Sequence, residues 1–399
     1  MRIVKIEDFH ADGGWRVFSF LKITTDDGLI GWSEYSETGW NRGLTVVIRR
    51  LAETVIGEDP RAFALISARL VAMTRMASGG INQQAIAAIE NSCLDIAGKA
   101  AGLPVHALFG GPVRDRIPVY WSHCGSFRVR NGELLERLLG TPPLRTLDDL
   151  KALGAEAVSR GFKAVKTNPV MFGDDGPRML NPGFAPAGLD LGHNAENSVV
   201  DGITDLLAAF RDGLGPDAGL ILDVNFSFRP EALHRIARAV EPFRLTWLEM
   251  DVHNPESLAD IRRESTTPIA SLESIFHRRG YRPYLEARSA DVAVIDVPWN
   301  GLAEAVRIAA MAEAYEINTA PHNFTGPLAN LMSAHFCAAV PNVRIMEIEV
   351  DDVPWKDDLL TSPGRIENGD FMVPTGPGWG ADINEDAIAA HPGFRPAYG

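Results

Sequence analysis

Short apolar runs recur at a nearly constant interval through the second half of the chain, and each run ends on a carboxylate or a histidine. These end residues are Asp223, Glu249, Glu273, Asp296, His322 and Glu347, in steps of 26, 24, 23, 26 and 25 positions. Runs that are apolar throughout indicate strands that are buried on both faces of a parallel sheet. A strand–helix repeat of this length predicts a closed barrel, in which residues at the carboxyl ends of the strands converge on one rim.

The first part of the chain lacks this repeat. Alternating apolar and polar positions predict a small sheet, and a longer stretch has apolar residues at helical spacing. The predicted elements are strands at residues 3–9, 17–25 and 29–34 and a helix at residues 81–101. We expect them to form an α+β capping domain over residues 1–115.

The barrel units begin with a predicted strand at residues 117–121 and include helical patterns such as residues 301–315. They end after Glu347, where a tail rich in Pro and Gly begins. We expect the barrel to occupy residues 116–355 and the C-terminal segment, residues 356–399, to return to the capping domain.

Two segments interrupt the barrel units directly after a strand, and therefore on the catalytic side. Residues 172–194 have the Gly and Pro content of a loop, and residues 124–145 carry Arg128, Arg130 and Arg145. Loops of this length in compact domains are usually lids, binding loops or disordered segments. We expect the first segment to be mobile without ligand, and either one is a candidate for substrate contact.

Composition and charge exclude several classes of protein. Hydrophobic residues make up 46% of the chain, which is ample for a large core, and the net charge of −14 argues against a nucleic-acid partner. The three cysteines are odd in number and widely spaced, which suits a reducing compartment. No apolar stretch approaches the ~18 residues needed to span a bilayer. We expect a cytoplasmic enzyme that does not bind membranes.

Asp223, Glu249 and Glu273 end three consecutive predicted strands. A lone acid at a strand end is more often solvated or ion-paired. Three crowded carboxylates, however, raise one another's pKa unless a cation neutralises them. Oxygen ligands without a nearby Cys or His favour a hard ion, so we expect Mg2+ before Mn2+ at this site.

Asp296 and His322 end the next two predicted strands. An acid on Nδ1 of a histidine fixes its tautomer and leaves Nε2 as a base, so the two residues are a candidate dyad. Lys166, near the end of an earlier strand, is a candidate to neutralise a substrate carboxylate. A structural ion pair with a metal-ligand acid is the alternative role for this lysine.

Taken together, these features resemble the mandelate racemase subgroup of the enolase superfamily, over essentially the whole chain. Residues 94–104 and 108–111 share the resemblance, and residues 311–327 are similar to the corresponding segment of galactonate dehydratases. The resemblance implies an α/β fold in which a capping domain covers a modified TIM barrel, (β/α)7β.

The resemblance also implies roles for particular residues. Mg2+ binds at the three acids, and Asp296 and His322 act as the dyad. Lys166 and Glu347 support the enolate oxygens, and capping residues such as Trp40 close over a small-molecule substrate. Barrels with capping domains often assemble as homo-oligomers, which we expect here as well.

Departures from the family pattern bear on the reaction. Racemases of this subgroup carry Lys-x-Lys on the second strand, where this chain has Asn168, and galactonate dehydratases carry Asp-x-His on the third, where it has Asn225. The usual Glu-Glu-Pro becomes Glu249-Met-Asp251, and Gly-Glu becomes Leu272-Glu273. We therefore expect Asn168 and Asn225 to contact substrate without acting as acid/base groups.

One strand-end base remains, which favours dehydration, because racemisation needs a second base. Charges aimed at both carboxylate oxygens stabilise the enolate that forms when the α-proton leaves. We expect syn dehydration of a sugar acid to a 2-keto-3-deoxy sugar acid, with His322 serving both steps. The alternatives are cycloisomerisation of a sugar-acid lactone, epimerisation with an acid/base from His193 or His123, and a non-catalytic metal-binding barrel.

Overall fold

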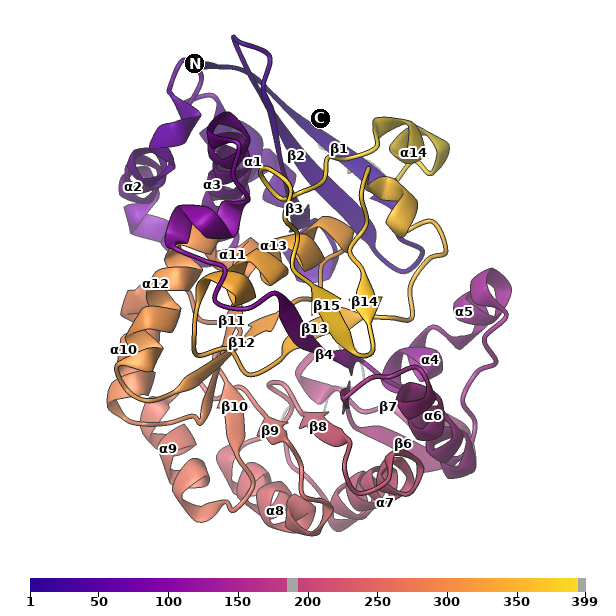
Figure 1. Cartoon of the computed structure of the whole chain (residues 1–399). Helices are drawn as coiled ribbons and strands as arrows, with labels where there is room; N and C mark the ends of the chain where they lie inside the picture. The colour runs from indigo at the N-terminus through magenta and orange to yellow at the C-terminus, as the bar shows by residue number, and fades with distance from the viewer. Residues whose placement is uncertain (185–192, 394–399) are drawn as a thin grey trace.

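The computed structural model describes residues 1–184 and 193–393, without the side chain of Trp40. The chain opens with a three-stranded antiparallel sheet, which lies above the barrel in Figure 1. The strands are β1 (Ile3–Asp12), β2 (Val17–Thr25) and β3 (Ile30–Ser36), and the helices beside them are α1 (Leu44–Ala52), α2 (Phe63–Met73) and α3 (Gly80–Ala101). Strand β3 packs so closely against α3 that a Cβ on Gly31 would overlap the carbonyl oxygen of Ser92.

Parallel strands form a closed barrel in the second part of the chain. They are β4 (Arg116–Ser122), β5 (Ala164–Thr167), β8 (Gly219–Asp223), β9 (Trp247–Glu249), β10 (Ile269–Ser271), β11 (Val292–Asp296), β12 (Asn318–His322) and β13 (Met346–Glu349). Strand β13 pairs with β4, and a bridge between Thr319 and Val343 links β12 to the segment just before β13. The parallel barrel predicted from the apolar repeat is confirmed.

Helices cover the outside of the barrel (Figure 1). They are α6 (Leu147–Ser159), α7 (Asn197–Leu214), α8 (Pro230–Val240), α9 (Pro255–Glu264), α10 (His277–Glu286), α12 (Leu302–Glu313) and α13 (Pro327–Ala339). Local sequence sets where several begin. Thr146 and Asp149 form a capping box at α6, and Asn254 accepts a hydrogen bond from the N–H of Ser257 at α9 (2.9 Å). Inward-facing side chains fill the barrel, including Tyr120, Ile221, Trp247, Val292, Val294 and Ala320.

The C-terminal segment connects the barrel to the capping domain. It contains β14 (Ile366–Glu367), β15 (Asp370–Met372) and α14 (Glu385–Ala390), and β15 pairs antiparallel with β4. Further along, the indole N–H of Trp379 donates to the carbonyl oxygen of Trp32 (2.7 Å). The backbone N–H of Trp379 donates to Asp95, which also accepts from the N–H of Trp32 (both 2.9 Å).

Two segments predicted as loops contain regular structure. A hairpin of β6 (Val170–Gly173) and β7 (Gly176–Met179) occupies the start of the first, because Asp174, Asp175 and Gly176 provide a tight turn. Residues 185–192, the centre of the segment that we expected to be mobile, lie outside the described residues. The second segment folds into α4 (Ser126–Arg130) and α5 (Gly132–Leu139).

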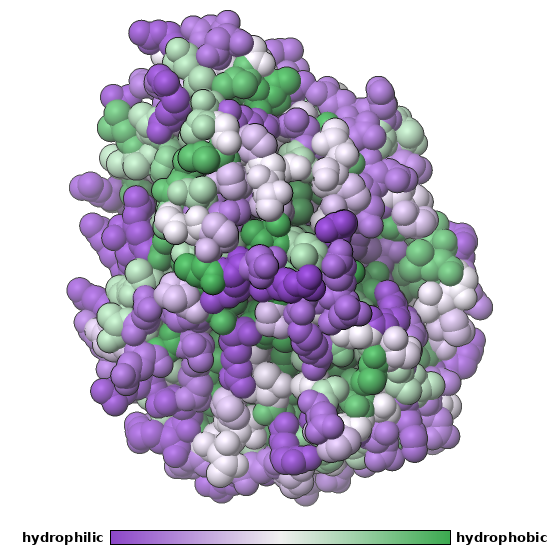
Figure 2. Space-filling view, viewed as in Figure 1, coloured by the Kyte–Doolittle hydropathy of each residue, from purple (hydrophilic) through white to green (hydrophobic). Residues whose placement is uncertain are grey.

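Figure 2 shows one face of the molecule as mostly hydrophilic, with apolar residues in small groups between polar ones. Across the described ranges, no helix combines the length and the apolar composition needed to cross a membrane.

Candidate active site

The three predicted metal ligands lie at the carboxyl ends of neighbouring strands. Asp223 and Glu249 are the last residues of β8 and β9. Glu273 follows β10 by two residues, after Leu272, whose φ is 93°. Asp223 and Glu249 are buried, whereas the Glu273 side chain is 12% exposed. Burial and the neighbouring carboxylates raise the pKa of all three acids, against the opposing effect of Lys166 and His322.

Lys166 lies among these acids as their counter-charge. Its ammonium is 2.8 Å from Glu347, 3.2 Å from Glu249 and 3.6 Å from Asp223. Burial opposes the charge on Lys166, but the surrounding carboxylates outweigh it and hold the lysine pKa well above its usual range. The lysine is therefore charged, and it neutralises part of the acid cluster.

The arrangement leaves the acids apart from one another. Lys166 contacts Asp223 and Glu249, while Glu273 Oε2 lies 3.4 Å from His322 Nε2. In the described part of the chain, no group of three or more His, Cys, Asp or Glu residues is gathered closely enough to hold a metal ion. The donor chemistry nevertheless fits a hard divalent cation, because the carboxylates outnumber the one ammonium among them. Burial first, and the neighbouring carboxylates second, raise their pKa values, and a bound cation would oppose both effects.

Asp251 is a further acid beside this cluster. In the sequence it stood out only as a departure from the Glu-Glu-Pro motif. It is buried, and Ser271 Oγ and the N–H of Leu272 both lie 3.3 Å from its Oδ1. Burial and the charges of Glu273, Asp223 and Glu249 raise the pKa of Asp251 well above its usual range.

Asp296 and His322 stand opposite each other in the parallel pair β11–β12. His322 Nδ1 lies 2.6 Å from Asp296 Oδ2, and Asp296 Oδ1 accepts a hydrogen bond from the N–H of Trp299 (2.6 Å). Burial lowers the pKa of His322, but the charges of Glu273, Asp296 and Glu347 outweigh burial and raise it to about 10. If the nearby carboxylates were neutralised, the pKa of His322 would fall toward neutral pH, and the histidine could then act as a base.

The sequence suggested that Glu347 is the last residue of its strand. In the structure β13 continues to Glu349, so this prediction is wrong. Glu347 accepts hydrogen bonds from Ser122 Oγ and from the N–H of Asn323 (2.8 Å for the latter). Residues two apart share one face of a strand, so the spacing of Glu347 and Glu349 was an available signal that we missed.

Glu349 holds a second histidine. Its Oε2 lies 2.8 Å from Nδ1 of His123, which follows β4 and stacks on Phe127 at 4.1 Å. Burial lowers the pKa of His123 to about 3, and His322 and Lys166 are among the charges that act on it. His123 is therefore neutral. Its ring and that of His322 both contact Phe324, with ring centroids 5.4 and 6.5 Å from that of Phe324.

The predicted substrate contacts surround Asp223 and the segment after it. Asn168 Nδ2 donates to the carbonyl oxygen of Asp223 (3.1 Å), and Asn225 donates to both carboxylate oxygens of Asp223 (2.9 and 3.0 Å). His193 Nδ1 lies 3.2 Å from the carbonyl oxygen of Phe226. The side chain of Trp40 lies outside the described residues. In this structure the two asparagines position Asp223, and their contact with substrate stays a prediction.

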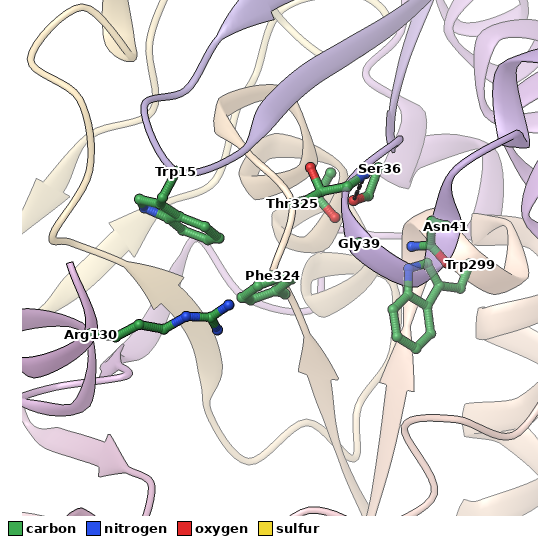
Figure 3. A pocket seen from close by; sticks show the side chains of 9 residues that line it. Trp15, Ser36, Gly39, Asn41, Arg130, Trp299, Phe324 and Thr325 are labelled. Carbon is green, nitrogen blue, oxygen red and sulfur yellow. Dashed lines mark hydrogen bonds between the residues drawn. The ribbon is translucent and has the colours of Figure 1, made fainter. Parts of the chain in front are cut away.

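A cavity of about 70 Å3 lies beside the dyad, between the capping domain and the barrel (Figure 3). Its wall includes Trp299 and Phe324, whose ring centroids are 5.1 and 6.5 Å from that of His322. The remaining lining residues are Trp15, Ser36, Thr38, Gly39, Asn41, Arg130 and Thr325.

Comparison with known families matches both parts of the chain. Residues 14–110 match the mandelate racemase / muconate lactonizing enzyme N-terminal domain, and residues 149–387 match the family described as enolase C-terminal domain-like. A D-xylonate dehydratase from Haloferax volcanii is 27% identical, covering 98% of this chain and 88% of its own. A D-galactonate dehydratase from Ralstonia nicotianae is 29% identical, covering 97% and 94% respectively.

A solved structure from Burkholderia xenovorans strain LB400 is 40% identical, covers 99% of each chain and superposes with a TM-score of 0.95. That protein carries the provisional name L-alanine-DL-glutamate epimerase, and a second structure under the same name contains magnesium and fumarate. The chain is thus an enzyme that resembles acid-sugar dehydratases, and it belongs to the enolase superfamily, in its mandelate racemase and muconate lactonizing enzyme group.

Proposed function

We propose that this enzyme removes the α-proton of a sugar-acid carboxylate and expels the β-hydroxyl, giving a 2-keto-3-deoxy sugar acid by syn dehydration. The dehydratase names of the relatives from H. volcanii and R. nicotianae support this reaction class. The observation that carries the proposal is the 2.6 Å contact of His322 Nδ1 with Asp296 on the neighbouring strand.

Mg2+ is the cofactor in this proposal, and Asp223, Glu249 and Glu273 are the residues that would hold it. The magnesium bound in the Burkholderia relative supports this choice. When bound, the ion supplies a Lewis acid that stabilises negative charge on the substrate carboxylate. Lys166 supplies a second positive charge from the chain itself, and Glu347 orients its ammonium at 2.8 Å.

His322 acts first as the base and then as the acid. Because Nδ1 donates to Asp296, Nε2 is the nitrogen that takes the α-proton, and the buried carboxylate stabilises the imidazolium that results. The electron pair of the broken C–H bond passes to the substrate carboxylate as an enolate. It then returns to form the C=C bond as the β-hydroxyl takes the proton from Nε2 and leaves as water. The product of this step is an enol, which becomes the 2-keto acid when it loses its O–H proton and gains a proton at the former β-carbon. One nitrogen serves both steps, so both groups leave from the same face.

Four further residues are proposed as substrate contacts. Asn168 and Asn225 stand at strand ends where relatives of known type carry acid/base groups, so here they contribute hydrogen bonds without moving a proton. His193 and Trp40 belong to segments that follow a barrel strand and the capping sheet, where they would close over the sugar chain.

The test is to incubate the holoenzyme with a panel of aldonic and aldaric acids in D2O and to measure 2-keto product and α-deuterium together. His322→Asn should lose both signals by about 10²- to 10⁴-fold. His234→Asn is the matched control, because His234 lies on α8 and pairs with Glu264 at the surface (3.3 Å). Product from a substrate whose α-hydrogen and β-hydroxyl are held anti, or α-exchange that survives in His322→Asn, would contradict the one-histidine mechanism.

Epimerisation is the second candidate, and one observation favours it specifically. His123, paired with Glu349 at 2.8 Å, packs against Phe324, whose ring also lies beside His322, so it is a candidate second acid/base group. The provisional epimerase name of the Burkholderia relative points in the same direction. Inversion at the α-carbon without loss of water, abolished in His123→Asn, would establish this reaction in place of dehydration.

A further inference from the structure

Three arginines follow the first barrel strand, and the structure separates them. Arg128 is buried and pairs with Glu156 (2.8 Å) and Asp351 (3.1 Å). Arg145 is exposed, just before α6, and does not line the cavity beside the dyad. Arg130 is exposed as well, but it lines that cavity, and its guanidinium reaches toward Phe324 in Figure 3. One of the three is therefore placed to meet a substrate.

The cavity wall carries one positive charge and no carboxylate. Among its nine lining residues Arg130 is the charged one, and no ion pair joins it to any other described residue. Asn41 Oδ1 accepts from Gln84 Nε2 (3.2 Å), so the amide group of Asn41 remains as a donor. In a chain with a net charge of −14, a recess of this kind favours an anionic ligand, because an unpaired guanidinium binds a carboxylate through two parallel hydrogen bonds.

The cavity also lies next to the proposed reaction centre. Trp299 and Phe324 form its wall and stand 5.1 and 6.5 Å from the His322 ring, centroid to centroid. A substrate with its α-carbon at His322 and its first carboxylate toward Lys166 would direct its far end past these rings. A water molecule needs about 10 to 15 Å3 of such volume, so a cavity of about 70 Å3 has room for a carboxylate group.

We propose that Arg130 binds a second carboxylate at the far end of the substrate, so that the enzyme prefers aldaric acids, which are sugar diacids, over aldonic acids. This inference rests on the proposed dehydration and names its substrate class. Ser36, Asn41 and Thr325 border the same cavity and bind the adjacent hydroxyl groups.

The experiment compares each aldaric acid with the aldonic acid of the same configuration, which differs only in having a hydroxymethyl group at the far end. The wild type should have the higher kcat/KM for the diacid. Arg130→Met should lower that value by about 10- to 100-fold, the effect of losing a hydrogen bond to a charged group, and should change the monoacid value by less than about 3-fold. Arg130→Lys, which keeps the charge, should recover part of the loss.

Arg145→Met is the matched control, because it removes an exposed arginine of the same segment and should change neither substrate. A wild-type preference for aldonic acids, or for their phosphate esters, would overturn the inference, as would equal losses on both substrates in Arg130→Met. These outcomes leave the dehydration intact. Failure of the proposed function differs from them, because no acid in the panel would then give 2-keto product or α-exchange.

Discussion

Replacing Lys166 by Met should make the stability of the enzyme depend strongly on Mg2+. The Lys166 ammonium lies 2.8, 3.2 and 3.6 Å from the buried side chains of Glu347, Glu249 and Asp223. At an effective dielectric constant of about 20, each contact gives about 5 kcal/mol of gross attraction. The cost of desolvating the ions offsets most of this, so removing one partner from such a buried cluster costs about 3 to 5 kcal/mol net.

The assay is thermal unfolding in EDTA and over a series of Mg2+ concentrations. Met keeps the length and the apolar stem of Lys, so the substitution changes the charge more than the packing. In EDTA, Lys166→Met should melt well below the wild type. Saturating Mg2+ should then raise its melting temperature more than that of the wild type, because a ligand that binds only the folded state stabilises it in proportion to RT ln(1 + [L]/Kd).

Lys163→Met is the control for this measurement. Lys163 is 48% exposed and pairs with Asp370 at the surface, where such a pair contributes about 0 to 1 kcal/mol. Equal melting temperatures of wild type and Lys166→Met in EDTA would refute the role of Lys166 as counter-charge. A melting temperature of Lys166→Met that ignores Mg2+ would refute the placement of the cation among these acids.

Three further changes have defined outcomes. Asp296→Asn removes the negative partner of His322 and should lower kcat by about 10²- to 10⁴-fold in steady-state kinetics. Its circular dichroism spectrum should be unchanged. A near-normal kcat would show that the dyad is not needed. Burial lowers the pKa of His335 from 6.5 to about 3 in the folded protein. As pH falls, this histidine therefore takes up a proton in the unfolded chain before it does so in the folded protein. The stability that is present above pH 6.5 is lost as the pH falls toward 3. Urea unfolding should show about 2 kcal/mol of this loss at pH 5, which His335→Gln should abolish, and an identical pH slope in the variant would exclude the assignment. Gly326→Ala places a Cβ onto Glu34 Oε1, so it should cost about 1 to 3 kcal/mol in the same assay, whereas wild-type stability would mean that the contact relaxes freely.

The strand repeat predicted most of the barrel because hydrophobicity marks every buried parallel strand in the same way. Asp223, Glu249, Asp296 and His322 are the last residues of their strands, as the spacing indicated. Glu273 lies beyond its strand because Leu272 adopts a positive φ, which a hydrophobic pattern does not encode.

What the sequence did not predict depends on contacts between distant segments. The ion pairs of Lys166 require three other strands to be in place, and the pair of His123 with Glu349 joins the first barrel strand to the last. The cavity at Arg130 requires the capping domain to be docked. Neither periodicity nor composition contains those distances.

The position of Trp379 has a consequence for how the protein is made. Trp32 and Trp379 are 347 residues apart, yet one hydrogen bond joins them, and both donate to the buried Asp95. At ~5 to 20 residues per second, a ribosome delivers Trp379 about 20 to 70 s after Trp32. For that interval the nascent capping sheet lacks one of its covering segments. Synthesis of the last residues, rather than of the first domain, therefore sets the earliest moment at which the capping domain completes its structure.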